Sequence, residues 1–160
     1  PAAPAPTAVD EAEPATPRGP EFVLSDAQRA ARDAALERLR ARGAHAQRLA
    51  ASTEAVEVDL GVLRPPAGDA ELALLSGLEP CLVELSLARS AVSDAGLAAL
   101  ARFGELRRLR LEHTALGDAA LAHLAPLTRL EALDLFATRV SDAGLAALRP
   151  LRALARLYTG

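Results

Sequence analysis

The sequence has no lysine, isoleucine, asparagine, methionine or tryptophan, a single cysteine, and only four aromatic residues among 160. A lone cysteine excludes an intrachain disulfide and a cysteine-based metal cage. All eighteen basic residues are arginine, which we attribute to codon usage in a GC-rich genome rather than to phosphate binding. With so few aromatic side chains, leucine, valine and alanine have to fill the core.

Charge is distributed unevenly along the chain. The formal net charge is −3, and the first 21 residues, with four carboxylates and one arginine, account for all of it. The remaining residues are neutral as a set. A neutral domain lacks the basic surface that binding to nucleic acid or an anionic membrane requires, so we expect neither as a partner.

Long hydrophobic runs are also missing. No apolar stretch approaches the roughly 20 residues that cross a membrane, and we expect no direct membrane insertion by this chain. The N-terminus lacks the basic-then-apolar pattern of a secretion signal, and no CxxCH motif for haem attachment occurs. Because the chain starts at Pro1 rather than methionine, we expect a processed protein or a piece of a longer one.

The N-terminal part divides into a linker and a helix. Residues 1–21 hold six of the eleven prolines together with alanine and acidic residues, and this composition predicts a disordered Pro/Ala-rich linker. A helix is predicted over residues 25–42, because Ser25 and Gln28 can form a capping box and Gly43 lies just past the end.

The predicted helix carries a modest apolar stripe and a separate set of arginines. The stripe consists of Ala30, Ala34, Leu36 and Leu39. We expect the arginines to be solvated rather than to form a basic docking face; they are Arg29, Arg32, Arg38, Arg40 and Arg42. After the helix, two β-prone segments, residues 44–50 and 55–60, predict the start of a sheet.

From residue 82 the sequence repeats with a period of 24. Each unit reads LxxLxLxxTxVxDxxLxxLxxLxx, and the string resembles the leucine-rich-repeat pattern. Full copies begin at Leu82, Leu106 and Leu130, a copy that begins at Leu154 is incomplete, and residues 68–78 form an irregular first unit. Nine positions recur in register, which chance does not produce.

This string predicts an α/β fold. In its LxLxx part, leucines alternate with other residues, which indicates a short strand with inward leucines. The part after each aspartate indicates a helical turn on the opposite side. We expect a leucine-rich-repeat solenoid with parallel strands on the concave face, short helices on the convex face and an N-terminal capping helix. One domain, residues 22–160, then comprises the cap and irregular first repeat, 22–81, and the regular repeats, 82–160.

Two sets of polar residues recur with the repeat. The first set, Asp94, Asp118 and Asp142, is expected to cap the helical turns rather than to act in catalysis. The hydroxyls of the second set, Ser90, Thr114 and Thr138, are expected to bond to loop backbone. The last copy stops within a strand, and we expect a neighbouring chain, a missing continuation or a crystal contact to cover that edge.

The Ala/Pro linker, the stretch ERLRARGAHAQRLAASTEAVEVDL and units reading VSDAGLAAL together resemble a bacterial arrangement. They are similar to the C-terminal repeat region, a ribonuclease-inhibitor-like domain, of membrane-bound proteins with a planctomycete-type cytochrome c domain. The resemblance covers about residues 30–160 and implies an extracytoplasmic domain tethered to the bacterial membrane through segments missing here. It implies no haem and no anchor for this chain, and Thr159 stands where that family has a core leucine.

No constellation of residues supports catalysis. The histidines, His45, His113 and His123, do not converge, and a metal site at Glu112 and His113 would rest on two adjacent residues, so a surface pair is preferred. Cys81 is expected to be a small buried hydrophobe rather than a reactive thiol. No Gly-rich phosphate loop or GxSxG elbow occurs. We expect no enzyme, no cofactor and no metal.

Strand alternation places the residues between the inward leucines on the concave face, in columns set by the period. The columns are Glu84, Arg108, Ala132 and Arg156; Ser86, Arg110, Asp134 and Tyr158; and Ala88, Glu112 and Phe136. Arg110 should lie beside Asp134, and Phe136 and Tyr158 should face solvent.

Exposed aromatic side chains flanked by arginine are typical of an interface hot spot. The predicted function is binding of a protein or peptide partner through Glu84, Arg108, Arg110, Glu112, Asp134, Phe136, Arg156 and Tyr158. One alternative is a structural spacer whose concave charges form only a solvated ladder of ion pairs. A catalytic domain is the alternative with least support.

Overall fold

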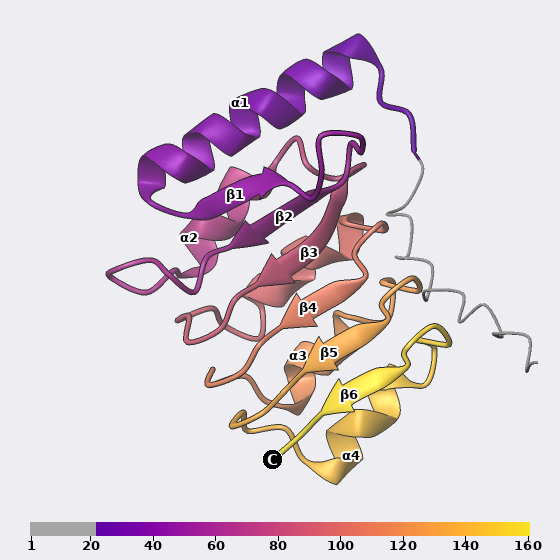
Figure 1. Cartoon of the computed structure of the whole chain (residues 1–160). Helices are drawn as coiled ribbons and strands as arrows, with labels where there is room; N and C mark the ends of the chain where they lie inside the picture. The colour runs from indigo at the N-terminus through magenta and orange to yellow at the C-terminus, as the bar shows by residue number, and fades with distance from the viewer. Residues whose placement is uncertain (1–21) are drawn as a thin grey trace, which may run out of the picture.

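A computed structural model of the chain describes residues 22–160, so the predicted linker lies outside the described residues (Figure 1). The described part contains a six-stranded sheet in which the spatial order of the strands equals their order in the chain. The strands are β1 (His45–Arg48), β2 (Val56–Asp59), β3 (Leu82–Ser86), β4 (Arg108–Arg110), β5 (Ala132–Asp134) and β6 (Arg156–Tyr158). β1 and β2 pair antiparallel, and β2 to β6 are parallel throughout.

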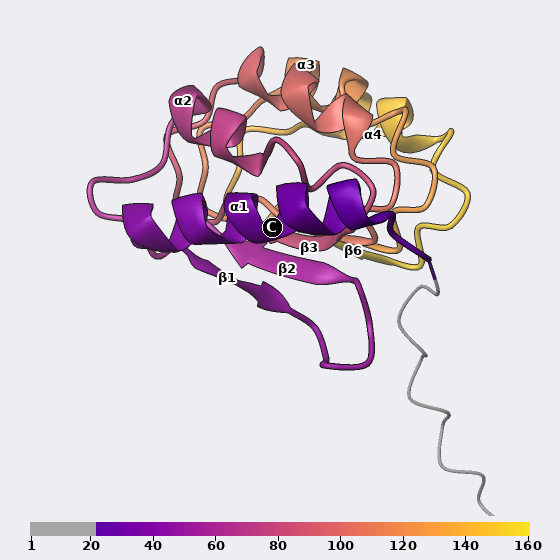
Figure 2. The same ribbon diagram turned by 90° about the horizontal axis from the view of Figure 1, so that it is seen from above.

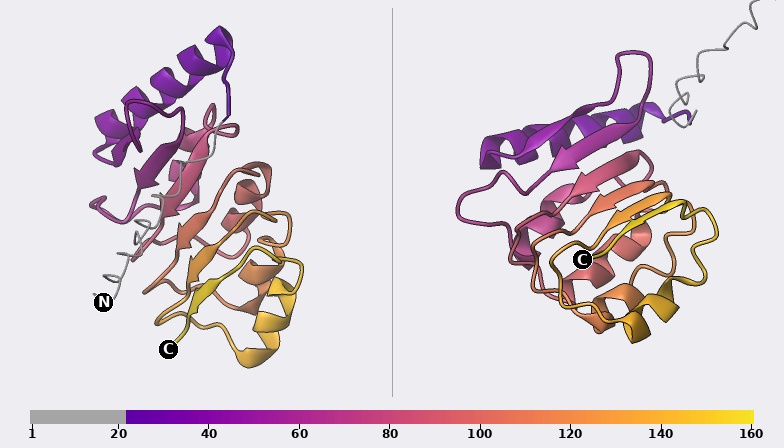
Figure 3. Two further views of the ribbon diagram at one scale, coloured as in Figure 1. Left: turned by 45° about the vertical axis from the view of Figure 1, so that its right-hand side comes forward. Right: turned by 60° about the horizontal axis from the view of Figure 1, so that its bottom comes forward.

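Short helical segments follow the parallel strands on one side of the sheet. They are α2 (Asp69–Leu72), η1 (Ala73–Leu75), η2 (Gly96–Arg102), α3 (Asp118–Ala122), α4 (Asp142–Leu145) and η3 (Ala146–Leu148). Seen from above, α2, α3 and α4 form a row that is separate from the row of strands (Figure 2). The two views of Figure 3 show the successive coils lying one below another. Parallel strands on one side and helical turns on the other agree with the predicted arrangement.

The strand register follows the 24-residue period. Leu85, Leu109, Leu133 and Leu157 are consecutive partners across β3 to β6. The first three of these leucines are buried, whereas Leu157 is 41% exposed because no further coil covers it in the described chain. The inward direction of the strand leucines is therefore confirmed, and their columns form the core between the sheet and the helical turns.

Helix α1 (Asp26–Arg42) covers the first coil, above β1 in Figure 1. The Ser25 Oγ accepts a hydrogen bond from the Gln28 N–H, and the Gln28 side chain accepts one from the Ser25 N–H. The helix ends at Gly43, whose φ of 99° lies in the left-handed region. The predicted capping box, glycine stop and capping helix are confirmed.

The buried face of α1 differs from the predicted stripe. Ala35, Leu36 and Leu39 are buried, whereas Ala30 and Ala34 are exposed. The predicted stripe is therefore confirmed for Leu36 and Leu39 and wrong for Ala30 and Ala34.

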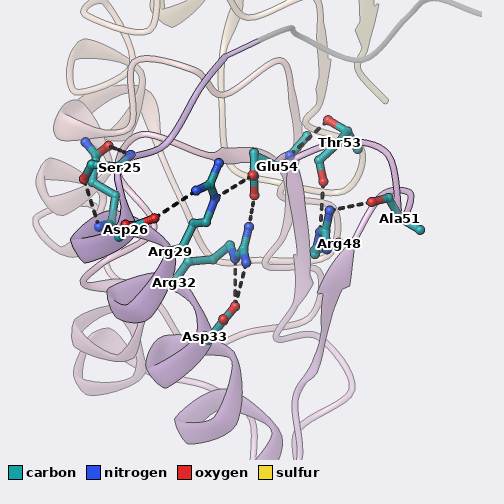
Figure 4. A network of polar contacts seen from close by, with 11 residues as sticks. Ser25, Asp26, Arg29, Arg32, Asp33, Arg48, Ala51, Thr53 and Glu54 are labelled. Atoms are coloured by element: carbon teal, nitrogen blue, oxygen red, sulfur yellow. Dashed lines mark hydrogen bonds and ion pairs between the residues drawn. The ribbon is translucent and has the colours of Figure 1, made fainter.

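The prediction that the helix arginines are solvated is confirmed for Arg38 and Arg40, which are exposed, and is wrong for Arg32. Its side chain is only 6% exposed, because it shares the buried face of α1. Arg32 donates to Asp33 and to Glu54, and Arg29 donates to the same Glu54 carboxylate at 2.9 Å (Figure 4). Hydrogen bonds from Arg29 and Arg32 hold the pKa of Glu54 below its ordinary value. The loop that carries Glu54 is held in turn by Arg48, which donates to two loop carbonyls.

The other three arginines also bond to the protein itself. Arg38 donates to the Ser76 carbonyl and Arg40 to the Ala46 carbonyl, each at 2.8 Å, and Arg42 donates to Glu71 at 3.2 Å. These acceptors lie in β1 and in the first coil. The arginine face of α1 thus docks the helix on its own sheet.

The prediction that the recurring aspartates cap their own helical turns is wrong for Asp94 and Asp118. Asp94 instead accepts from the Gly117 N–H at 2.9 Å and Asp118 from the Ser141 N–H at 2.6 Å, each directly before the helix of the next coil. Asp69 of the irregular first unit likewise accepts from the Ser93 N–H at 2.8 Å. The period brings each carboxylate beneath the unpaired N–H of the coil that follows. We call this series of hydrogen bonds from backbone N–H groups to aspartate carboxylates the aspartate ladder. It joins consecutive coils on the convex side.

The aspartate ladder explains two glycines of the repeat. A Cβ on Gly96 would lie 2.1 Å from Asp69 Oδ1, and one on Gly144 would lie 2.2 Å from Asp118 Oδ1. In both coils the aspartate also accepts from a serine hydroxyl, which draws the carboxylate over the glycine. In the coil between these two, Gly117 stands in place of the serine, and Ala120 stands in place of the glycine.

The hydroxyls of the repeat behave as predicted in two coils of three. Thr114 Oγ1 donates to the Leu111 carbonyl and Thr138 Oγ1 to the Leu135 carbonyl, each at 2.7 Å. The Ser90 Oγ is buried without a hydrogen-bond partner among residues 22–160, so the prediction is wrong there. The shorter serine lacks the methyl group that fixes the rotamer of a threonine.

Candidate functional site

The face of the sheet that lies away from the helical turns is the candidate binding surface, and we call it the concave face. It is hollowed into a groove of about 400 Å³. Residues from all six strands line the groove, so it runs across the strands. Six of the eight predicted binding residues contribute to it, namely Glu84, Arg108, Arg110, Asp134, Arg156 and Tyr158.

Two of the three predicted columns are confirmed by the strand register. The first consists of Glu84, Arg108, Ala132 and Arg156, which are consecutive backbone partners. The second consists of Ser86, Arg110, Asp134 and Tyr158. A period of 24 residues advances the chain by one strand per unit, which is why the columns follow from the sequence alone.

The side chains in these columns pair differently from their backbones. Arg108 contacts Glu84 of the neighbouring strand at 2.9 Å. Arg110 pairs with Glu112 of its own strand end, although its backbone partner is Asp134. Asp134 accepts instead from the Phe136 N–H at 2.9 Å, an Asx-type turn that directs the carboxylate onto its own backbone. The expected position of Arg110 beside Asp134 is confirmed for the backbone only.

Two of the four aromatic residues are exposed at one end of the concave face. Phe136 is 50% exposed and Tyr158 is 52% exposed, whereas Phe103 is fully buried. The His113 ring packs edge-on against Phe136, with ring centres 5.6 Å apart. The predicted exposure of Phe136 and Tyr158 is confirmed, and His113 joins them as part of the same patch.

The first two strands add residues that the sequence analysis did not assign to the site. His45, Glu57 and Asp59 line the groove beside β3. Gln47 donates to Glu57 at 2.5 Å, and His45 Nε2 lies 3.5 Å from the same carboxylate. The alternation of valine and acidic residues over 56–59 could have predicted this, because inward valines leave Glu57 and Asp59 on the concave face.

A second hollow of about 290 Å³ lies where β2, β3 and β4 end. Arg64, Arg89 and Arg110 line it together with Glu112 and Ser86. Glu112 is 9% exposed, and its Oε2 and the Ser86 Oγ have no hydrogen-bond partner among residues 22–160. Arg110 donates to the other oxygen of the Glu112 carboxylate. The prediction that Glu112 is a surface residue is therefore wrong.

The titratable residues do not assemble into a reactive centre in the described part of the chain. Within residues 22–160 no group of three or more histidine, cysteine or acidic side chains is placed to hold a metal ion. Cys81 is fully buried, and burial raises the pKa of its thiol to about 12. Its interpretation as a small buried hydrophobe is confirmed, whereas the absence of enzyme activity stays a prediction. No helix in the same range is both long and apolar enough to cross a membrane.

No match was found among the curated proteins. Among solved structures, an internalin from Listeria monocytogenes is similar, with 22% sequence identity and a TM-score of 0.42. The alignment covers 54% of this chain and 30% of the internalin chain. Residues 80–101, which include β3 and most of the turn η2, match the family model described as Leucine Rich repeat. These residues are therefore similar to a leucine-rich repeat, and most of them belong to the first full copy of the 24-residue unit.

Proposed function

We propose that this chain is a protein-interaction module that binds a protein or peptide partner on the concave face of a leucine-rich-repeat solenoid. Stacked repeats create an extended concave surface, and proteins built from them commonly bind other proteins there. The binding residues in this proposal are those predicted from the sequence other than the buried Glu112, together with the exposed groups of β1 and β2.

One observation carries the proposal: the chain exposes Phe136 and Tyr158 beside arginines, although it has almost no other aromatic residues. Large apolar rings are costly to leave in water, and at an interface they bury a large area with little loss of side-chain entropy. Arg156 lies two residues before Tyr158 on the same face of β6. An aromatic and arginine patch of this kind is typical of an interface hot spot.

The spacer interpretation is supported by the ion pairs. Arg108 with Glu84, and Arg110 with Glu112, are already paired without a partner, and exposed pairs of this kind contribute little. These pairs give no reason for the exposure of the two rings, however, and we therefore favour binding.

A partner captured from native membranes with the full chain as bait provides the test. Arg108→Ala combined with Phe136→Ala should weaken its affinity by roughly tenfold or more, since hot-spot residues dominate binding energies. Arg108 is preferred to Arg110 because removal of Arg110 would leave the buried Glu112 unpaired. A matched control removes one arginine and one exposed apolar side chain elsewhere, Arg149→Ala with Val23→Ala. Equal affinity of the concave variant and the wild type would contradict the proposal.

We also propose that the chain is part of a larger bacterial protein that is tethered to the membrane and holds this domain outside the cytoplasm. The support is the resemblance of residues 37–60 and of the VSDAGLAAL units to the repeat region described above. An antibody against the domain should find it in the membrane fraction, released by detergent but not by high salt, and open to protease in intact spheroplasts. Release by salt alone would contradict tethering.

A further inference from the structure

The groove on the concave face carries its charges in two separate blocks. The lining residues from β1, β2 and β3 include three carboxylates and no arginine: Glu57, Asp59 and Glu84. The lining residues from β4, β5 and β6 include three arginines, Arg108, Arg110 and Arg156, and one carboxylate, Asp134. One end of the groove is therefore acidic and the other is basic.

The ion pairs within the protein do not cancel this separation of acidic and basic residues. Arg108 and Glu84 neutralise each other where the two blocks meet. Glu57 accepts from the neutral Gln47 and lies 3.5 Å from His45 Nε2, and Asp59 accepts from the backbone N–H of Gly61, so no arginine neutralises either carboxylate.

At the opposite end of the groove Arg156 forms no ion pair with any of residues 22–160. The Arg156 side chain is exposed, and Arg156 lines the groove together with Tyr158, two residues further along β6. Charge without an ionic partner thus remains at both ends, on Glu57 and Asp59 of β2 and on Arg156 of β6, and also on Asp134 of β5, whose carboxylate accepts from the Phe136 N–H.

We propose that the partner segment is an extended, charge-polarised peptide that crosses the strands, with its basic end over β2 and its acidic end over β6. This inference rests on the proposed binding function and specifies its partner. A lysine or arginine of the peptide contacts Glu57 and Asp59, and an aspartate or glutamate contacts Arg156. Like charges in the reverse orientation repel at both ends, and this repulsion selects the direction of binding.

The spacing of the charges on the partner follows from sheet geometry. Adjacent strands lie about 4.8 Å apart, so four steps from β2 to β6 span about 19 Å. An extended peptide advances about 3.3 Å per residue, and the charges of the partner should stand about six residues apart. A uniformly acidic segment fits less well, because its far end would lie over Glu57 and Asp59.

Synthetic peptides of equal composition test the polarity. One probe carries two lysines at one end and two glutamates at the other, separated by about five uncharged residues; the second carries the same residues with the charges interleaved. Fluorescence anisotropy at low ionic strength should show roughly tenfold tighter binding of the segregated probe. Added salt should remove the difference, because exposed charges are screened. Equal affinities, or no binding of the segregated probe, would overturn the proposal.

Protein variants locate the effect. Glu57→Gln with Arg156→Gln should abolish the preference for the segregated probe. The control removes the same two charges from the convex side, Asp142→Asn with Arg149→Gln, and should keep the preference. A preference that survives in the concave variant contradicts the assignment to these residues.

A spin label reports the orientation directly. On the glutamate end of the segregated probe it should broaden the amide NMR signals of β5 and β6, and on the lysine end those of β1 and β2. Equal broadening from both ends, or the reverse pattern, overturns the polarity. If the captured natural partner still loses affinity with Arg108→Ala and Phe136→Ala, the binding function stands although the polarity is wrong. If that loss is absent as well, the concave face is not the binding site.

Discussion

The cap and the regular repeats are held together in different ways. In the repeats, many stabilising contacts join residues about 24 apart in the chain: the leucine columns, the aspartate ladder, and ion pairs such as Arg107 with Glu131. In the cap, residues 22–81, the arginines of α1 make contacts that do not recur, and their acceptors lie far away in the chain, including Glu54 and Glu71.

This difference has consequences for stability. A residue inside the stack supports a coil on each side, and a nearest-neighbour array transmits its loss in both directions. A residue in the cap supports only the end of the stack. A destabilising substitution in the repeats should therefore lower the stability of the whole stack, whereas one in the cap should destabilise only the cap.

Leu111→Ala should have the largest effect. Leu111 is fully buried at the centre of the stack, and deletion of a buried leucine side chain costs roughly 2 to 5 kcal/mol of unfolding free energy. Hydrogen exchange should increase in β3 and β5 as well as in β4. The control is Leu157→Ala at the exposed end, which should cost much less. An unchanged melting curve for Leu111→Ala would mean that the inward and outward assignments are exchanged.

Arg32→Ala should have the next largest effect and should remain local. The buried guanidinium bonds to Asp33 and Glu54, and the loss of charged hydrogen bonds costs about 2 kcal/mol. Hydrogen exchange should increase in α1 and in the β1–β2 hairpin but not in β4 or β5. Arg32→Met serves as a control for packing, because it keeps the stem without the charge. An equal increase throughout the sheet would remove the contrast between cap and repeats.

Gly144→Ala should lower the melting temperature, although alanine in a helix is normally favoured over glycine by roughly 0.5 to 1 kcal/mol. The new Cβ would displace the Asp118 carboxylate from Ser141 and break one step of the aspartate ladder. The double change Ser141→Gly with Gly144→Ala reproduces the natural combination at Gly117 and Ala120 and should restore stability. A single variant as stable as the wild type would contradict this role of the ladder.

The pH dependence should be the smallest effect, and both regions contribute to it. Ser141 lowers the pKa of Asp118, and Arg29 and Arg32 lower that of Glu54. A carboxyl group whose pKa is lower in the folded state adds stability above its unfolded pKa, near 4, and this stability is lost as the pH falls through the folded pKa.

Carbon NMR titration of the carboxyl groups separates the two contributions. Both midpoints should lie below the ordinary range for their residue types. Ser141→Ala should raise the midpoint of Asp118 and leave that of Glu54 unchanged. A shift of both midpoints would show that the ladder and the cap are coupled.

The sequence predicted the recurring parts of this protein better than the unique ones. Leu109 and Leu133 were placed in the core because a period of 24 residues repeats their environment, and the same period placed Arg108 and Tyr158 on the concave face. Glu57 and Asp59 were not assigned to the site, because β2 precedes the regular repeats. Helix α1 was predicted from its capping signals, but Arg32 was placed on the wrong face because burial of an arginine depends on a distant partner.

By itself, the sequence determined the stacking direction, the strand register and the residues that share a column, because these depend only on backbone periodicity. Only the tertiary structure decided how the polar side chains pair. Asp118 bonds to the next coil rather than to its own helix, Arg110 bonds to Glu112 rather than to Asp134, and Arg32 reaches Glu54. Each of these choices depends on side-chain rotamers and on distances between coils, which are set when the coils pack against one another and not by the spacing of residues along the chain.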